Sequence, residues 1–329
     1  MSRQVAVAIP ASTANLGPGF DCLGMALGIY NEVQMEAEEG FVPFRPFGND
    51  EVEIEISGEG GDLLNRSPEN LVCRSAGELF RMAGKRPKRL KIRCDNRIPL
   101  ARGMGSSSAA IVGGLVAANA LLDEGYCQEG YRRNEMLEVA ARLEGHPDNV
   151  ASALLGGITV TLVAGERLLV RRIPPPEDLA VILAVPTFAL RTSQARKALP
   201  AMIPFSDAVF NISRTAYLVA LLSGANAPDG DPFFLAELAD ATEDRLHQPY
   251  RAPLIPGFAD ARRAAREAGA MAVALSGAGP AVAAFSRKTA GDDQNRAIGA
   301  AMQEAFSRNG ISSNILITAP SITGAEVKK

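Results

Sequence analysis

The segment from Ala109 to Leu122 constrains the fold of this chain more than any other feature of its sequence. It contains no charged residue and, wound as a helix, is apolar all round. Such a helix lies in the middle of a globular domain or spans a membrane. The uncharged runs at residues 103–122 and 268–286 are interrupted by serines, glycines and a proline, so neither suits a lipid-facing span. We therefore predict a soluble protein with a buried central helix and no membrane partner.

Composition narrows the class of protein. The 329 residues include 34 Lys and Arg against 37 Asp and Glu, a formal charge of −3, and this length suffices for two domains with full cores. Aromatic residues make up 5% of the chain and tryptophan is absent. An acidic chain poor in aromatics offers neither a surface for the phosphate backbone nor stacking platforms for bases, so we expect no nucleic-acid partner.

Cysteine and histidine usage predicts a reducing compartment and no zinc site. The four cysteines are widely spread and form no CxxC pair: Cys22, Cys73, Cys94 and Cys127. Neither of the two histidines, His146 and His247, lies near a cysteine in sequence, which leaves zinc without a ligand set. Pro10 comes too early for the apolar region of a signal peptide. We expect free thiols and a cytoplasmic location.

Periodicity predicts a mixture of strands and helices. Apolar and alternating runs favour strands at 5–9, 51–56, 90–94, 156–163, 179–185, 270–275, 281–285 and 313–318. Helical spacing favours helices at 67–80, 109–122, 135–143, 210–222, 233–242, 258–268 and 295–308, the first capped by Ser67. Three prolines at 174–176 follow the expected domain boundary, which divides the chain into 1–168 and 169–329 to within about ten residues.

The residues that precede the central helix indicate a phosphate site. They form a glycine- and serine-rich loop: Pro99, Leu100, Ala101, Arg102, Gly103, Met104, Gly105, Ser106, Ser107, Ser108 and Ala109. Glycines let a ligand approach the backbone, and the first amide groups of the helix point into the loop with a partial positive charge. The alternative is that the serines only cap the helix. The loop lacks both the GxxxxGK(S/T) and the GxGxxG nucleotide signatures.

Three further segments carry small or polar residues between the predicted elements. Residues 275–280 join two strands with more glycine than a hairpin needs, although a tight structural turn is the alternative. Residues 10–21 bring Asn15 and Asp21 close to glycines, or else form a loop whose side chains bond its own backbone. Residues 144–149 form an acidic loop, in which Asp148 or Asn149 could instead cap a following helix.

Taken together and in their order along the chain, the four segments resemble the motifs of the GHMP kinase superfamily. Residues 248–251 (Gln-Pro-Tyr-Arg) are similar to a substrate segment of the same family, and the resemblance covers nearly the whole chain. It implies an α+β fold of two domains. The first would be like the second domain of ribosomal protein S5 and the second a ferredoxin-like sandwich, with ATP in the cleft between them.

The resemblance also implies how the nucleotide is held. Residues 99–109 would wrap the phosphates of ATP, Ser107 and Glu144 would hold Mg²⁺, and Asn70 would lie near the adenine or the ribose. Many family members have a longer insert after the metal glutamate, so Glu138 is a rival ligand. Arg102 stands where relatives have small polar residues, and we expect it to point to solvent rather than to a phosphate.

The amino-acid substrate implied by the resemblance is L-homoserine, phosphorylated on its side-chain hydroxyl in threonine biosynthesis. Arg196 and Arg251 would bind its carboxylate, because a guanidinium fork matches a carboxylate. Asp148 would orient the hydroxyl, with general-base catalysis as the alternative. The residues implied around the rest of the substrate are Asn15, Asp21, Asp148, Asn149 and Gly277.

Two other functions stay open. A GHMP kinase for mevalonate or a related alcohol acts on a substrate without an amine, so Asp21 would have no ammonium group to bind. A catalytically silent, amino-acid-binding regulator would have no need of Ser107, Glu144 and Asp148. A homodimer is compatible with the resemblance.

Overall fold

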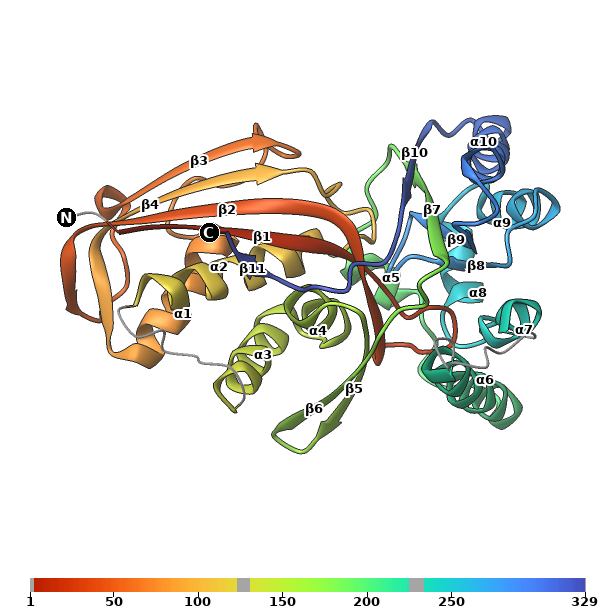
Figure 1. Ribbon diagram of the computed structural model, residues 1–329, viewed down its shortest axis with the longest axis horizontal. Coiled ribbons are helices and arrows are strands. Elements are labelled where there is room, and N and C mark those ends of the chain that lie inside the picture. Colours follow the sequence, from red (N-terminus) through yellow and green to blue (C-terminus); the bar gives the residue numbers. More distant parts are fainter. Residues whose placement is uncertain (1–2, 123–130, 225–233, 329) are drawn as a thin grey trace.

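The computed structural model describes residues 3–122, 131–224 and 234–328. Two sheets, each covered by helices, form two units that lie side by side along the long axis of the molecule (Figure 1). The order of strands differs between the two sheets.

The sheet of the first unit has seven strands: β1 (Arg3–Ala14), β2 (Leu23–Pro43), β3 (Val52–Gly58), β4 (Lys85–Asn96), β5 (Ile158–Ala164), β6 (Arg167–Ile173) and β11 (Glu326–Val327). Its order is β11-β1-β2-β4-β3, and β5 pairs with the beginning of β2 and with β6. Only β3 and β4 are parallel among these pairs, and they are joined by the crossover helix α1 (Leu71–Ala83).

The central helix predicted from the sequence is α2 (Ser106–Leu121), and the prediction is confirmed. It lies against the sheet beside α1, α3 (Tyr131–Glu144) and α4 (Asp148–Leu155) (Figure 1). Ile111 and Leu115 are fully buried on it. A Cβ added to Gly114 would lie 2.4 Å from the carbonyl oxygen of Val72, so a glycine is required where α2 crosses α1 this closely.

The sheet of the second unit has the order β10-β7-β9-β8 and is antiparallel throughout: β7 (Leu179–Pro186), β8 (Ala272–Leu275), β9 (Val282–Arg287) and β10 (Ser313–Thr318). With α9 (Phe258–Glu267) before β8 and α10 (Asp292–Arg308) before β10, this is the ferredoxin-like arrangement. Phe258, Met302 and Phe306 are buried in its core. The two-domain α+β fold implied by the resemblance is therefore confirmed.

The remaining helices lie between β7 and α9. They are α5 (Thr192–Lys197), α6 (Phe205–Gly224), α7 (Phe234–Ala241) and α8 (Gln248–Arg251), followed by the 3-10 turn η2 (Ala252–Leu254). Another 3-10 turn, η1 (Asn49–Glu51), precedes β3 in the first unit. In Figure 1, α5 lies near the junction of the two units, and α6 and α7 lie at the lower right. Asn211 and Thr215 of α6 donate to the carbonyl oxygen of Pro18, in the segment between β1 and β2. The short helices thus place side chains between the units.

The change of sheet occurs between Ile173, the end of β6, and Leu179, the start of β7. The division at 168/169 stays a prediction, and it falls inside β6. After β10 the chain returns to the first unit, where β11 pairs with β1 (Figure 1). The polypeptide therefore passes between the units twice.

Two local predictions are wrong. Residues 10–14 belong to β1 rather than to a loop. The cap of α1 is Asn70, whose Oδ1 accepts a hydrogen bond from the main-chain N–H of Val72 (2.9 Å), not Ser67. An asparagine directly before the helix competes well for the cap position. The long strand β2 has no counterpart among the predicted elements.

The thiols of Cys22, Cys73 and Cys94 are free, as predicted, whereas Cys127 lies outside the described residues. Burial raises the pKa of Cys73 to about 12 and that of Cys94 to about 11, so both stay protonated. Among the helices that the structure describes, none is long and apolar enough to cross a membrane.

Candidate active site

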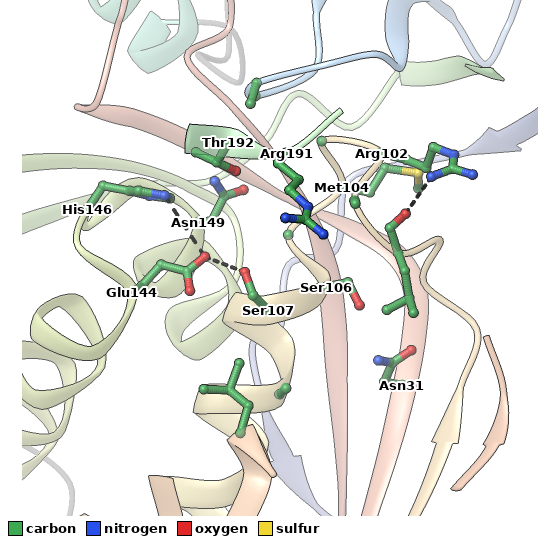
Figure 2. Close-up of a pocket in the computed structure, with 18 of the residues that line it drawn as sticks. Asn31, Arg102, Met104, Ser106, Ser107, Glu144, His146, Asn149, Arg191 and Thr192 are labelled. Carbon is green, nitrogen blue, oxygen red and sulfur yellow. Dashed lines mark hydrogen bonds and ion pairs between the residues drawn. The ribbon is translucent and has the colours of Figure 1, made fainter. Parts of the chain in front are cut away.

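A cavity of about 560 Å³ opens where the two units meet. Its wall includes almost every residue implied for the nucleotide and the substrate; of the loop at 99–109, only Pro99, Ser108 and Ala109 do not line it. Figure 2 shows the start of α2 below the cavity, with Glu144 and His146 on one side and Arg102 on the other. Segments far apart in the sequence therefore form one site.

The glycines of the phosphate loop have the backbone geometry that the sequence suggests. Gly103 and Gly105 have φ of 78° and 69°, in the left-handed region that favours glycine. A Cβ on Gly103 would lie 2.1 Å from the carbonyl oxygen of Ser276, and one on Gly105 would lie 2.1 Å from Oγ of Ser12. No side chain caps α2 at Gly105. The loop is thus pressed against its neighbours while the first amides of α2 face the cavity, a favourable place for a phosphate.

Ser107 and Glu144 come together at the cavity wall. Oγ of Ser107 donates to Oε1 of Glu144 at 2.5 Å, and Ser108 donates to the same oxygen at 2.8 Å. Glu138 points elsewhere: its Oε1 accepts from the main-chain N–H of Leu168 on β6 (3.4 Å), and it does not line the cavity. The geometry therefore favours Glu144 over Glu138 as the partner of Ser107.

The oxygens of Ser107 and Glu144 fit Mg²⁺ by their chemistry, because this ion prefers hard oxygen ligands. Within the described ranges, no group of three or more His, Cys, Asp or Glu side chains is arranged to hold a metal. A protein contribution of one hydroxyl and one carboxylate agrees with the usual Mg²⁺ sites of kinases, in which phosphate oxygens supply further ligands.

Asp148 is buried at the start of α4, 2% exposed, and its Oδ1 accepts three hydrogen bonds. The donors are Nδ1 of His146 (2.8 Å), with the imidazole N–H assigned to that atom, the main-chain N–H of Asn149 (2.7 Å) and the Asn149 side-chain amide (3.3 Å). The Asn149 Oδ1 in turn accepts from Ser12 (2.8 Å). Neither side chain caps α4. The network fixes one carboxylate oxygen of Asp148 firmly.

His146 is a site residue to which the sequence assigned no role. Burial lowers the pKa of its imidazole, but the hydrogen bond to Asp148 and the charges of Asp148 and Glu144 outweigh burial and raise the pKa above its usual value. Its Nε2 lies 4.0 Å from Oε1 of Glu144 (Figure 2). His146 thus links the candidate metal ligand to Asp148, and its position between them in the sequence was the available signal.

Asp21 and Arg196, which both line the cavity, form a bidentate ion pair with nitrogen–oxygen distances of 2.7 and 2.9 Å. The loop before Asp21 is held by Asn15, whose Oδ1 accepts from the main-chain N–H of Asp21 (3.0 Å). Asn15 also donates to the carbonyl oxygen of Gly277 (3.0 Å). Asp21, implied for the ammonium group of the substrate, and Arg196, implied for its carboxylate, therefore lie side by side.

Arg251 is 2% exposed and is held by the protein itself. Its Nη1 donates to the carbonyl oxygen of Gly277 (3.0 Å), and its guanidinium lies 5.2 Å from the centre of the Phe20 ring. Burial, followed by the nearby charge of Arg196, lowers the pKa of Arg251 to about 10. Gly277 therefore contributes a carbonyl that orients both Asn15 and Arg251.

Arg102 does not point to solvent, so that expectation is wrong. Its guanidinium donates to the carbonyl oxygens of Pro186 (2.7 Å), Leu100 (2.9 Å) and Thr187. The main-chain N–H of Leu190 also donates to the carbonyl oxygen of Ala101 (3.1 Å). The phosphate loop is thereby fastened to the segment that follows β7. No alternation of polar and apolar residues could have revealed this contact.

Asn70 lines the cavity, but its side chain is already engaged. Besides capping α1 it donates to the carbonyl oxygen of Asn65 (2.6 Å). By capping α1, Asn70 holds the first turn of that helix at the cavity wall. Asn70 would therefore affect a bound nucleotide through the position of α1.

Comparison with known proteins agrees with this geometry. The family model for the GHMP kinase N-terminal domain matches residues 70–157, and the model for the GHMP kinase C-terminal domain matches residues 233–308. The homoserine kinase of Carboxydothermus hydrogenoformans is 45% identical over 98% of this chain and 96% of its own length. That of Moorella thermoacetica is 44% identical over 98% of this chain and 99% of its own. The chain belongs to the homoserine kinase family of GHMP kinases.

A solved structure supports the same family assignment. The crystal structure of homoserine kinase from Cytophaga hutchinsonii superposes with a TM-score of 0.83 at 28% identity, covering 99% of this chain and 97% of that one.

The N-terminal family model spans the phosphate loop, Glu144 and Asp148, whereas Arg191 and Arg196 lie between the two models.

Arg191 and Thr192 also line the cavity, although the sequence did not single them out. In Figure 2 both side chains enter from the second unit, and the guanidinium of Arg191 points toward Ser106 and Ser107. An exposed arginine ahead of a short helix carries no sequence signal of its own, because arginine is common on protein surfaces.

Proposed function

We propose that this member of the homoserine kinase family transfers the γ-phosphoryl group of ATP to the side-chain hydroxyl of L-homoserine, which yields O-phospho-L-homoserine and ADP and serves threonine biosynthesis. One observation carries the proposal. The paired charges of Asp21 and Arg196 share a cavity with the phosphate loop and with Asp148. The family membership and the homoserine kinase relatives support the same substrate.

The phosphate loop suits the triphosphate. The amides at the start of α2 supply donors and a partial positive charge, and the left-handed glycines let the phosphates approach the backbone. Ser107 and Glu144 would hold Mg²⁺, which when bound would neutralise charge on the transferring phosphoryl group. The rest of catalysis in such a transfer is positioning.

The acceptor is a zwitterion with one hydroxyl. Asp21 would receive its ammonium group, and Arg196 and Arg251 would receive its carboxylate. In the structure Asp21 and Arg196 neutralise each other, so the substrate would replace one ion pair by two. A mevalonate-type alcohol has no group for Asp21, which is why we favour an amino acid.

Asp148 would orient the acceptor hydroxyl. Its Oδ1 is occupied by the donors from His146 and Asn149, which holds the carboxylate in place and directs its other oxygen for contact with the substrate. The transition state of phosphoryl transfer is loose, so the hydroxyl need not lose its proton early. Orientation therefore suffices for the step.

An ADP-release assay with four acceptors tests the proposal. We expect turnover with L-homoserine well above that with L-threonine and L-serine, and none with mevalonate. Turnover with mevalonate alone would identify a different GHMP kinase. Binding of homoserine by calorimetry without any ADP release would identify the silent regulator.

We also propose that the protein is a cytoplasmic homodimer. Helix α6 packs its buried face through Leu218 and Leu222 and leaves a second apolar stripe exposed. The stripe consists of Phe205, Val209, Ile212, Ala216 and Ala220, and Met202 (87% exposed) extends it. The stripe and Met202 together expose an apolar surface on the order of 600 Å², which is as large as the largest apolar patches of monomeric proteins. It is close to the roughly 800 Å² that each partner buries in a standard interface.

A second copy of this chain is the occupant that fits. The stripe contains no charged side chain, so two α6 helices related by a twofold axis would bury the same apolar surface on both sides. Light scattering should give twice the 34.7 kDa of the chain. Ile212→Asp should halve that mass, whereas Leu63→Asp should not, because Leu63 is even more exposed (86% against 68%) but lies between β3 and α1 in the first unit. A monomeric wild type would refute the dimer.

A further inference from the structure

The cations of the cavity are unequally available to a ligand. Four arginines line it, against four carboxylates: Arg102, Arg191, Arg196 and Arg251, and Asp21, Glu69, Glu144 and Asp148. Arg102 donates to three carbonyl oxygens, Arg196 is paired with Asp21, and Arg251 is buried on the carbonyl of Gly277. Among the lining residues that the structure describes, the guanidinium of Arg191 is the one without a protein acceptor.

Arg191 extends toward the phosphate loop. Figure 2 shows its side chain descending from the second unit, with the guanidinium between Thr192 and the serines at the start of α2. Ser107, which pairs with Glu144, lies on this side of the loop. A γ-phosphoryl group between the loop and Asp148 would therefore have the amides of α2 on one side and Arg191 on the other.

The backbone that carries Arg191 is fixed relative to the phosphate loop. Leu190, its neighbour, donates to the carbonyl oxygen of Ala101 (3.1 Å), and Arg102 reaches back to the carbonyl oxygens of Pro186 and Thr187. Gln194 holds Arg191 itself, because its Oε1 accepts from the Arg191 N–H (3.2 Å) and its own N–H donates to the Arg191 carbonyl (2.9 Å). A guanidinium fixed in this way loses less freedom on meeting a ligand.

We propose that Arg191 is a catalytic residue of the phosphoryl transfer, supplied by the second unit, whose guanidinium donates hydrogen bonds to the γ-phosphoryl oxygens of ATP. This inference rests on the proposed function. The step breaks the bond between the γ-phosphorus and the oxygen that bridges it to the β-phosphorus, and the bonding pair leaves with ADP. A bond forms to the acceptor oxygen, and the hydroxyl proton is released to solvent. Arg191 stabilises the negative charge on the oxygens of the group in transit.

Nucleotide binding without any acceptor is the first test. Calorimetry compares ADP with the non-hydrolysable analogue adenosine 5′-(β,γ-imido)triphosphate on wild type, Arg191→Ala and Arg191→Gln. Since the contact is to the γ-position, we expect the Kd of the analogue to rise by about tenfold or more, the effect of losing one charge-assisted hydrogen bond, and the Kd of ADP to change little. An equal change for both nucleotides, or no change for either, would overturn the assignment.

Turnover is the second test. Arg191→Ala should lower kcat by about a hundredfold or more, and Arg191→Lys should recover only part, because an ammonium group lacks the planar fork. Added guanidinium should restore activity to Arg191→Ala but not to Arg191→Lys. The matched control is Lys197→Ala, an exposed cation on α5 that does not line the cavity, which should leave kcat and both Kd values unchanged.

The outcomes separate this inference from the proposed function. If wild type is active on homoserine and Arg191→Ala keeps its kcat within about threefold, the inference fails alone. If Arg191→Ala raises the KM of homoserine with kcat unchanged, Arg191 binds the acceptor and the inference also fails. If wild type shows no activity on homoserine but Arg191→Ala still loses its preference for the analogue over ADP, the phosphate contact stands and the proposed acceptor is wrong.

Discussion

The substitution Arg196→Ala should weaken the binding of homoserine much more than it lowers the stability of the fold. In the structure the guanidinium is paired with Asp21 at 2.7 and 2.9 Å, and the two side chains are 36% and 34% exposed. An ion pair this accessible to water contributes about 1 kcal/mol or less to folding. In a chain of this size that corresponds to a fall in Tm of at most about 4 °C.

The expected loss of homoserine affinity is larger than that loss of stability. A hydrogen bond from a guanidinium to a substrate carboxylate is worth about 1.5–3 kcal/mol, which is about 12- to 150-fold in KM. The KM of ATP should stay within about threefold, because Arg196 lies on the Asp21 side of the cavity. Arg251→Ala is a poorer probe, since its guanidinium is buried and holds Gly277 and Phe20 in place.

Steady-state kinetics with homoserine varied at saturating ATP, combined with thermal unfolding, measures both quantities. Lys197→Ala, which removes a cation from the next position of the same helix, is the control and should behave as wild type. A fall in Tm well beyond 4 °C would mean that Arg196 supports the fold more than about 1 kcal/mol allows. A rise in the KM of both substrates together would mean that the cavity has collapsed, and either result would refute the reasoning.

Three further outcomes are expected. Glu144→Ala should lower kcat by about a hundredfold or more while Glu138→Ala stays near wild type, measured by ADP release; the reverse result would make Glu138 the metal ligand. Asp148→Asn should keep kcat within about a hundredfold of wild type at saturating homoserine and retain both limbs of the pH–rate profile, whereas loss of a limb with a thousandfold fall would identify a general base. The main-chain N–H of Gly48 and two neighbouring arginines lower the pKa of Glu51 from 4.5 to about 2, so its contribution to stability is present above pH 4.5 and lost as the pH falls toward 2. The Tm difference between wild type and Glu51→Gln should shrink over that range, and a constant difference would contradict this.

Features encoded within one stretch of sequence were predictable. The buried helix α2 follows from a segment without charge, and the strand predicted at 313–318 has the bounds of β10. The left-handed glycines of the phosphate loop are expected where the backbone must come close to a ligand and to other segments of the same chain. In each case the physical cause lies in the residues themselves, so local reasoning suffices.

Features that arise only when distant segments meet were not predictable. Asp21 and Arg196 are 175 residues apart and pair only because the two units face each other. The resemblance assigned each of them to the substrate, and nothing local could show that they also bind one another. The prediction for Arg102 was wrong for the same reason, since two of its three acceptors are the carbonyl oxygens of Pro186 and Thr187 in the other unit. The roles implied for these residues stay predictions until the variants are measured.

The return of the chain from β10 to β11 means that the first unit is built from two separate pieces of polypeptide, whereas the second, from β7 to β10, is one continuous piece. Val7 and Ala8 of β1 pair with Val327 and Glu326, and Gly324 packs so closely on Leu154 that a Cβ there would lie 2.2 Å from its carbonyl oxygen. A fragment ending after β6 would lack this strand and leave the edge of β1 open to pairing with other chains. During synthesis the first unit can be completed only after the second has been made, so the first unit cannot finish folding while the second is still being synthesised.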